Sequence, residues 1–222
     1  MSGFPSDMGE ANRVDRTRYE KELHVNGVQT VAGIDEAGRG PLAGPVVAAA
    51  VIFPHGESIE GLRDSKKLTP RSRERYFKKI HEAALSVGIG IVDEDLIDRV
   101  NILQGTRIAM IRAIENLSVV PDYLLVDGMP LPESPLPQRA LIKGDDLSQS
   151  IAAASVIAKV TRDGLMREYH ERYPRYNFSS NKGYGTAEHL RALDQFGPCP
   201  IHRRSFAPVR VRSGGSGPGP GA

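Results

Sequence analysis

Residues 46–53 (VVAAAVIF) form an unbroken apolar run, and no other feature of the sequence constrains the fold as strongly. A strand with one face in water alternates apolar and polar side chains, whereas this run presents apolar side chains to both faces. It is also far shorter than the ~20 residues that cross a membrane as a helix. We therefore predict a strand inside a sheet that is covered by helices on both sides.

Shorter apolar runs and helical patterns surround this strand. Thr69-Pro70 is a typical helix start, with an N-cap residue before a proline in the first turn. Further strands are expected at 28–34, 87–92, 123–126 and 139–142. Helices are expected at 16–26, 69–86, 93–116 (in two pieces), 148–173 and 186–196. This order predicts an α/β fold with a mixed central β-sheet flanked by helices, and a C-terminal helical segment.

The 222 residues suit one domain, which we place at 16–209. Residues 1–15 are polar and are expected to be disordered, and 210–222, which include SGGSGPGPGA, are expected to form a low-complexity flexible tail. The sequence has neither a signal-peptide pattern nor an apolar run of membrane length. Its single cysteine, Cys199, excludes an internal disulfide framework. We expect a cytoplasmic monomer with a reduced thiol and no membrane partner.

The net charge of +2 is unevenly distributed along the chain. Residues 159–222 contain 11 Lys and Arg against 5 Asp and Glu, so the final third is basic. Such a distribution favours a polyanionic partner approached from one side, although solvated basic helices give the same count.

Three aspartates stand at the ends of apolar, strand-like runs. Asp35 follows TVAGI, Asp127 follows YLLV, and Asp145 follows ALIKG, while Glu36 is next to Asp35. Ligands bind at the carboxyl ends of strands in open α/β sheets, and gathered carboxylates repel one another unless a cation binds. Either the four acids form a metal cluster, or the aspartates cap three separate loops.

Oxygen ligands favour Mg²⁺ or Mn²⁺ over zinc or copper. The six histidines show no zinc-type spacing, so we expect them to be surface or packing residues.

A glycine-rich turn follows the first of these acids. Gly38, Gly40 and Gly44 give G-x-G-x-x-x-G, which misses the dinucleotide-binding fingerprint by one residue. The sequence also lacks the G-x-x-x-x-G-K-[ST] pattern of a phosphate-binding loop. The turn could bring backbone and Arg39 close to a phosphate, or it could be a tight turn with a solvated arginine.

Six segments, in order and in register, make the sequence similar to the type 2 ribonuclease H family, and to bacterial ribonuclease HII within it. They extend over residues 16–209 and together are highly specific. The segments are GIDEAGRGPLAGPVVAAAVI (33–52), DSKKLTPRSRE (64–74), LLVDG (124–128), IKGDDLSQSIAAASVIAKVTRD (142–163), NKGYGTAEH (181–189) and GPCPIHRRSFAPV (197–209).

This resemblance implies a ribonuclease H-like fold and a single catalytic domain with four metal-binding and catalytic acids, namely Asp35, Glu36, Asp127 and Asp145. It also implies that Gly38, Arg39, Gly40 and Tyr184 bind the substrate and read the ribonucleotide. A second acid, Asp146, follows the KGD motif, which leaves two candidates for the fourth ligand, and we favour Asp145.

The activity that the resemblance implies is endonucleolytic. A ribonuclease of this family cuts the RNA strand of RNA/DNA hybrids and ribonucleotides embedded in duplex DNA, as needed for ribonucleotide excision. The products carry 3′-hydroxyl and 5′-phosphate ends. We expect Mg²⁺ or Mn²⁺ as the cofactor, with two ions in the substrate complex.

Asp35 and Glu36 can share a metal site only if the strand ends there, because neighbouring strand residues point to opposite faces. We expect Ala37-Gly38 to supply that turn, with Asp35 bridging two ions and Glu36 binding one. Four basic residues are candidate phosphate contacts, namely Lys66, Lys143, Lys159 and Arg162.

Three alternatives remain open at this point. Ribonuclease HIII shares the four acids but would need a sizeable N-terminal domain, and about 30 residues precede the first expected strand. A DNA-only nuclease on the same fold is disfavoured by the Gly-Arg-Gly turn and Tyr184. A non-catalytic nucleic-acid-binding module is disfavoured by the presence of all four carboxylates.

Overall fold

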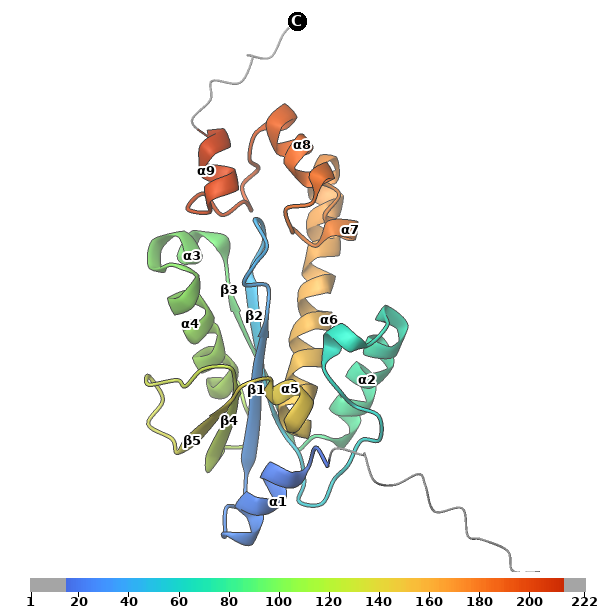
Figure 1. Cartoon of the computed structure of the whole chain (residues 1–222), viewed down its shortest axis with the longest axis vertical. Helices are drawn as coiled ribbons and strands as arrows, with labels where there is room; N and C mark the ends of the chain where they lie inside the picture. The colour runs from blue at the N-terminus through green and yellow to red at the C-terminus, as the bar shows by residue number, and fades with distance from the viewer. Residues whose placement is uncertain (1–14, 214–222) are drawn as a thin grey trace, which may run out of the picture.

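The computed structural model describes residues 15–213, which contain a five-stranded mixed sheet with helices on both faces (Figure 1). The strand order is β3-β2-β1-β4-β5. Neighbouring strands from β3 to β1 run antiparallel, whereas β1, β4 and β5 run parallel. The strands are β1 (Val31–Ala37), β2 (Val46–Ile52), β3 (Ser86–Val92), β4 (Tyr123–Asp127) and β5 (Gln138–Leu141). The predicted α/β class and mixed sheet are confirmed.

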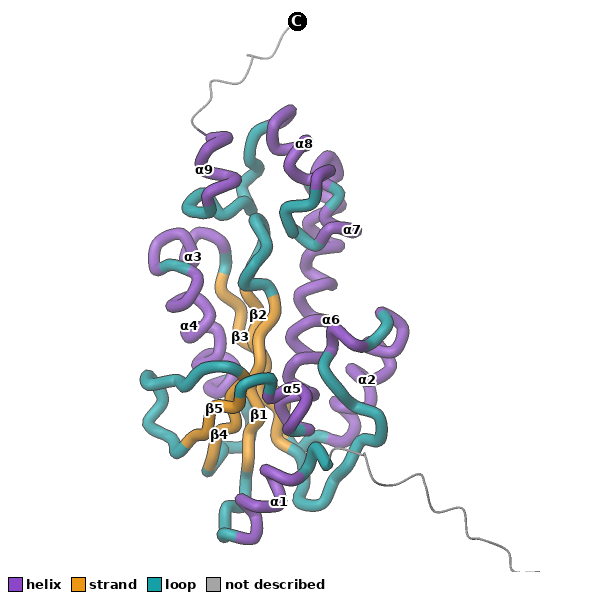
Figure 2. The backbone as a smooth tube through the Cα atoms, in the orientation of Figure 1, coloured by secondary structure: helices purple, strands orange, loops and turns teal. Residues whose placement is uncertain are grey.

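The helices follow the predicted order with several short additions (Figure 2). The longer ones are α1 (Arg18–Val25), α2 (Pro70–Ala83), α3 (Glu94–Val100), α4 (Ile102–Glu115), α6 (Gln149–Arg172) and α8 (Ala187–Phe196). The short ones are η1 (Ser65–Lys67), α5 (Gly144–Leu147), η2 (Pro174–Tyr176), α7 (Phe178–Asn181) and α9 (Ala207–Ser213). Within residues 15–213, none of these helices has the length and apolarity that a membrane crossing requires.

Strand β2 is buried along its whole length, as its apolar sequence predicts. Val47, Ala49 and Val51 pack against α2 and α6, while the alternate residues of the strand face α3 and α4 on the other side. Figure 1 shows these two pairs of helices on opposite sides of the sheet. The strand therefore contributes to two cores, which is why no polar side chain is tolerated in it.

Glycines let two helices lie directly on the sheet. A Cβ atom added at Gly33 of β1 would lie 2.1 Å from the carbonyl carbon of Ser150 in α6. One added at Gly90 of β3 would lie 1.9 Å from the carbonyl oxygen of Ala109 in α4. Both distances are far inside van der Waals contact, so these positions require glycine.

A third core joins the C-terminal helices to the end of α6. Its buried members are Leu42, Ala43, Met166, Tyr176, Phe178, Ala192, Leu193, Cys199, Ile201 and Val209. Helix α9 extends this segment to Ser213, so residues 210–213 are helical where the sequence predicted a flexible tail. The remaining predictions for the two ends, at residues 1–14 and 214–222, lie outside the described part of the chain.

Candidate metal centre

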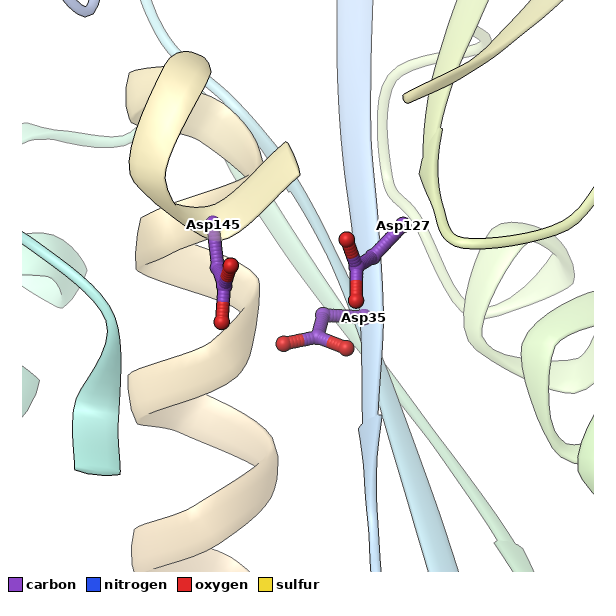
Figure 3. Close-up of side chains that lie close together, drawn as sticks. All are labelled: Asp35, Asp127 and Asp145. Atoms are coloured by element: carbon purple, nitrogen blue, oxygen red, sulfur yellow. The ribbon is translucent and has the colours of Figure 1, made fainter. Parts of the chain in front are cut away.

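Three of the predicted acids meet at one place on the sheet. One carboxylate oxygen from each of Asp35, Asp127 and Asp145 lies within 4.8 Å of the other two (Figure 3). Asp35 belongs to β1, Asp127 is the last residue of β4, and Asp145 lies in α5. Residues far apart in the sequence therefore form one carboxylate cluster, and the alternative of three separate loop caps is excluded.

The parallel pairing of β1 with β4 brings the first two acids together. Ile34 is in register with Val126, so Asp35 and Asp127 each follow a paired residue. Here the prediction that the first strand ends before Asp35 is wrong. Asp35 and Glu36 pair with Ala49 and Ala48, and the strand continues to Ala37 because its antiparallel partner β2 provides hydrogen-bonding groups up to that point.

Asp145 reaches the cluster through a turn after β5. Lys143 adopts a left-handed conformation (φ 57°, ψ 44°), which reverses the chain into α5. The prediction of a strand running to Ile142 is therefore slightly too long, and Asp145 stands in the first turn of a helix. A Cβ atom at Gly144 would lie 2.6 Å from Cδ1 of Ile151 and 3.3 Å from Oδ1 of Asp127, so a larger residue would have to displace the Ile151 side chain.

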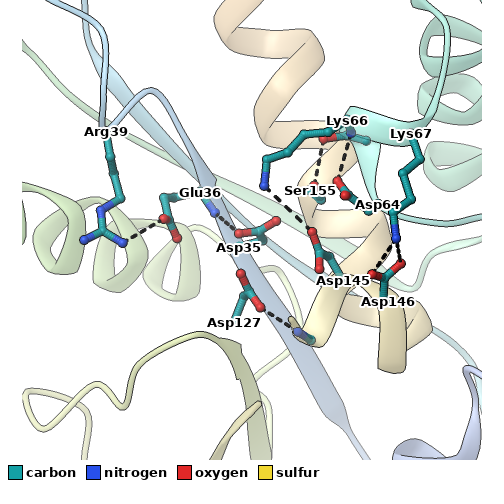
Figure 4. Close-up of polar contacts among 12 residues, drawn as sticks. Asp35, Glu36, Arg39, Asp64, Lys66, Lys67, Asp127, Asp145, Asp146 and Ser155 are labelled. Atoms are coloured by element: carbon teal, nitrogen blue, oxygen red, sulfur yellow. Dashed lines mark hydrogen bonds and ion pairs between the residues drawn. The ribbon is translucent and has the colours of Figure 1, made fainter. Parts of the chain in front are cut away.

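Asp146 has a different environment from Asp145. Its carboxylate forms an ion pair with Nζ of Lys67 at 2.6 Å and lies outside the group of three (Figure 4). Asp145 is buried, and Nζ of Lys66 approaches it at 4.0 Å. The geometry thus places Asp145 in the cluster, as favoured from the sequence.

Glu36 lies beside the cluster and not within the group of three. Its carboxylate accepts a hydrogen bond of 3.3 Å from Nη1 of Arg39, and its backbone N–H donates to Oδ1 of Asp35 at 2.7 Å. Figure 4 shows its side chain close to Asp35 and Asp127. Its negative charge contributes to the field that Asp35 experiences.

Burial and mutual repulsion favour protonation of these acids in the absence of a cation. Burial, followed by the charges of Glu36 and Asp127, raises the pKa of Asp35 well above its usual value. Burial, followed by the charges of Asp64 and Asp127, raises the pKa of Asp145 to about 6. Burial also raises the pKa of Asp127, opposed by the Gly144 N–H. The carboxylates of this centre therefore carry negative charge that no nearby cation fully compensates.

Two side chains that the sequence analysis did not select complete the surroundings. Asp64 is buried and accepts a hydrogen bond of 2.8 Å from the Lys66 N–H, and its charge helps to raise the pKa of Asp145. Ser155, buried on α6, hydrogen-bonds the hydroxyl of Ser65 at 2.8 Å and the carboxylate of Asp35. Asp64 opens the DSKK segment, and its place in that motif was the available signal.

The donor set fits a hard divalent cation. All three clustered ligands are carboxylate oxygens, which suit Mg²⁺, Ca²⁺ or Mn²⁺ and not the softer metals. A cation would also relieve the repulsion that raises the carboxyl pKa values. The Asp35, Asp127 and Asp145 side chains can therefore bind a metal ion.

A pocket beside the cluster brings together the predicted substrate-binding residues. The turn 38–40 and Tyr184 line it together with Glu36, Lys66 and Lys159. Tyr184 is exposed, and its Cε1 atom would lie 3.6 Å from a Cβ added at Gly40. The turn and the tyrosine thus lie close together around a space that Glu36 also lines.

The four candidate phosphate contacts divide into two groups. Lys66 and Lys143 are exposed, and Lys159 is half-buried and forms an ion pair with Asp163 at 2.7 Å. Arg162 is 1% exposed and donates to the carbonyls of Pro45, Lys182 and Ala43, so its assignment as a phosphate contact is wrong. Its guanidinium supports the backbone of the pocket.

A family model described as Ribonuclease HII matches residues 32–209 of the chain. The chain is 59% identical to ribonuclease HII of Geobacillus kaustophilus over 193 residues, covering 87% of this chain and 74% of the relative. It is 55% identical to ribonuclease HII of Listeria innocua over 200 residues, covering 90% and 76%.

Solved structures agree with the fold. The ribonuclease H2 of Pyrococcus horikoshii OT3 superimposes with a TM-score of 0.70 at 28% identity, covering 83% of this chain and 97% of that one. The ribonuclease HII of Archaeoglobus fulgidus, solved in a complex with PCNA, gives 0.64 at 26% identity, covering 78% and 93%. A Bst ribonuclease HIII solved with Mn²⁺ gives 0.67 at 18% identity, covering 96% and 77%, and shows the fold alone.

Proposed function

Because this chain belongs to the ribonuclease HII family and is an endonuclease of the hydrolase class, we propose that it cuts both RNA/DNA hybrids and ribonucleotides embedded in duplex DNA. Cleavage on the RNA strand would leave 3′-hydroxyl and 5′-phosphate ends. We assign this activity to one catalytic domain at residues 16–209, acting as a monomer in the cytoplasm.

One observation carries the proposal. Glu36, the neighbour of Asp35 in the chain, lines the pocket between the turn 38–40 and Tyr184, so the clustered carboxylates of Asp35, Asp127 and Asp145 lie next to it. A phosphodiester bound at the acids would have its sugar beside the turn and the tyrosine. The 2′-hydroxyl distinguishes RNA from DNA, so a reader at this place would see the distinguishing group.

The acids Asp35, Glu36, Asp127 and Asp145 would hold Mg²⁺ or Mn²⁺, with two ions in the substrate complex. Divalent cations at such a centre activate a water molecule and neutralise charge on the phosphate. The protein's own contribution is preorganisation, because the Gly144 N–H fixes the Asp127 carboxylate and Ser155 contacts that of Asp35.

The pocket residues have separate roles in this proposal. Backbone groups of Gly38 and Gly40 would meet the 2′-hydroxyl, Arg39 would approach a phosphate, and Tyr184 would stack on or block the neighbouring sugar. Lys66 and Lys159 would contact phosphates, so cleavage should weaken as salt concentration rises.

Cleavage mapping on three substrates tests the proposal. A DNA duplex with one ribonucleotide and a continuous RNA/DNA hybrid should both be cut in Mg²⁺, and an all-DNA duplex should stay intact. The ends of each product would be identified by ligation and phosphatase treatment. Cleavage of the all-DNA duplex, or 2′,3′-cyclic ends, would contradict the proposed specificity or chemistry.

The role of Tyr184 needs a separate comparison. Tyr184→Ala should lower the rate at a lone ribonucleotide about tenfold or more relative to the continuous hybrid, since loss of a stacking aromatic costs ~1–3 kcal/mol. Phe196→Ala removes a similarly exposed aromatic side chain from α8 and serves as the control. Equal losses on the two substrates would mean that Tyr184 supports general binding and reads no junction.

A further inference from the structure

The C-terminal segment 201–203 lies against the loop that follows the Gly-Arg-Gly turn. The Gly44 N–H donates to the Ile201 carbonyl at 2.8 Å, and the Arg203 N–H donates to the Leu42 carbonyl at 2.9 Å. Between these bonds, Ala43 and His202 form an isolated antiparallel bridge. Two consecutive residues of this segment, His202 and Arg203, then send their side chains to opposite walls of the pocket.

Arg203 holds the wall formed by the turn 38–40. Its guanidinium is fully buried and donates to the carbonyls of Gly38 at 2.6 Å, Arg39 at 3.0 Å and Gly44 at 2.8 Å. A buried guanidinium is costly unless its N–H groups are satisfied, and its rigid fork fixes the relative positions of the acceptors. The Gly38 and Arg39 carbonyls of the turn are therefore held by Arg203.

His202 holds the Tyr184 wall through a chain of two imidazoles. The Cys199 N–H donates to Nδ1 of His202 at 3.0 Å, so the proton of His202 resides on Nε2. Nε2 of His202 lies 2.9 Å from Nε2 of His189, and Nδ1 of His189 donates to the Tyr184 carbonyl at 2.9 Å. Each neutral ring thus donates once and accepts once.

Burial keeps both imidazoles neutral at neutral pH. His189 and His202 are at most 1% exposed, and burial lowers the pKa of both, that of His202 to about 4. The rings of Tyr176 and Phe178 pack around them. The hydrogen-bond directions along the chain are consequently fixed, from the Cys199 N–H to the Tyr184 carbonyl.

We propose that His189, His202 and Arg203 are positioning residues that set the separation between Tyr184 and the turn 38–40. The inference rests on the proposed role of these two walls in reading the ribonucleotide. Small misplacements of groups that position a substrate cost far more than the contact energy itself, so loss of these bonds should blunt recognition of a lone ribonucleotide. The carboxylate cluster makes no contact with the imidazole chain, and the basic cleavage chemistry should remain.

Two variants separately disrupt the Arg203 contacts with the turn 38–40 and the chain of imidazoles that ends at Tyr184. Arg203→Lys keeps the positive charge but cannot reach three carbonyls with one ammonium group. His189→Leu removes the donor to the Tyr184 carbonyl, and His189→Asn restores a donor near the position of Nδ1. Met110→Ala, a core variant beneath the opposite face of the sheet, controls for loss of stability in general.

The measurement is the ratio of kcat/KM on a DNA duplex with one ribonucleotide to kcat/KM on a continuous hybrid, at fixed salt and Mg²⁺. Arg203→Lys and His189→Leu should lower this ratio about tenfold, with partial recovery in His189→Asn and no change in Met110→Ala. In a double-mutant cycle, His189→Leu should lower the ratio far less when Tyr184 is already alanine, because contacting sites are not additive.

The outcomes separate this inference from the proposed function. If Tyr184→Ala lowers the ratio but Arg203→Lys and His189→Leu do not, the positioning role alone is overturned. If Tyr184→Ala leaves the ratio unchanged, the reader assignment fails and the inference fails with it. Additive effects in the cycle would show a merely structural role. Should His189→Leu not fold, Arg203→Lys and His189→Asn decide the question.

Discussion

Asp127 accepts a hydrogen bond of 2.6 Å from the backbone N–H of Gly144, the residue before Asp145. Asp127 therefore holds the turn that carries Asp145. The same bond orients the Asp127 carboxylate before any cation binds. Because a ligand that is already oriented loses little freedom on binding, this bond lowers the entropic cost of metal association.

Asp127→Asn should abolish nearly all cleavage while the fold is retained. The amide oxygen can still accept from Gly144, so the turn persists, but one negative charge leaves the cluster. Since burial raises the pKa of Asp127, the metal-free variant should melt at the same temperature as the wild type or higher. Cleavage in Mg²⁺ tests the predicted loss of activity, and thermal unfolding in EDTA tests the predicted stability of the metal-free variant.

The matched control for this substitution is Asp122→Asn. Asp122 stands just before β4, at the opposite end of the strand from Asp127, and accepts hydrogen bonds from Gln29 and Thr30. Its substitution should leave cleavage intact. Wild-type cleavage by Asp127→Asn would show that the cluster is wrongly assigned.

Asp145→Asn should damage cleavage far more than Asp146→Asn. Asp145 is buried among the other acids, whereas Asp146 is paired with Lys67 near the surface. Loss of such a partly exposed pair costs about 1 kcal/mol or less, so Asp146→Asn should change both stability and rate only slightly. Initial rates of the two variants on one substrate give the comparison, and the reverse order of damage would make Asp146 the fourth ligand.

The sequence was sufficient to predict those parts of the fold in which a buried element is encoded by consecutive apolar residues. The apolar run of β2 has no polar position, and its two buried faces require helices on both sides. Asp35, Asp127 and Asp145 could likewise be predicted as metal ligands, because an acid at the end of a buried strand costs stability unless it is paired or binds a cation. In these cases a local pattern and the tertiary environment agree.

The remaining features depend on partners that are distant in the sequence. Arg162 and Arg203 look like surface cations, but backbone carbonyls from residues 38–45 and 182 accept their hydrogen bonds, which allows them to be buried. Asp64 is unremarkable until η1 folds beside α5. Strand β1 runs past Asp35 because β2 pairs with it there, and no local signal in residues 28–37 records that partner.

Gly90→Ala should destabilise the protein, because the new methyl group would lie 1.9 Å from the Ala109 carbonyl oxygen. Forcing a helix away from the sheet costs ~1–3 kcal/mol or more. Gly164→Ala is the matched control. Gly164 lies inside α6, the nearest neighbouring atom is 3.9 Å from its added Cβ, and alanine there should stabilise the helix by ~1 kcal/mol. Chemical denaturation measures both, and equal effects of the two substitutions would contradict the packing of α4 on β3.

Metal-free protein should lose stability as pH rises through the pKa of the clustered acids. Burial and the charges of Asp64 and Asp127 raise the pKa of Asp145 from 3.8 to about 6, and the pKa of Asp35 is raised in the same direction. The folded state then binds these protons more tightly than the unfolded state does. Their contribution to stability is complete below about pH 4 and is lost as pH rises through about 6.

Other groups also titrate in this window, so the informative quantity is the difference between wild type and Asp145→Asn in EDTA. The variant should gain stability relative to wild type between pH 4 and 7, by about 1–2 kcal/mol, because solvent screening lowers the ~1.4 kcal/mol that each pKa unit would otherwise represent. Mg²⁺ should raise the melting temperature of the wild type at pH 7 more than at pH 5, because protons compete with the cation for the carboxylates. Thermal unfolding across this range, with and without Mg²⁺, gives both comparisons. Two results together would contradict this prediction: a stability difference that stays constant with pH, and a Mg²⁺ effect that is equal at pH 5 and pH 7. They would mean that Asp145 is already ionised in the metal-free protein and that its neighbours do not raise its pKa.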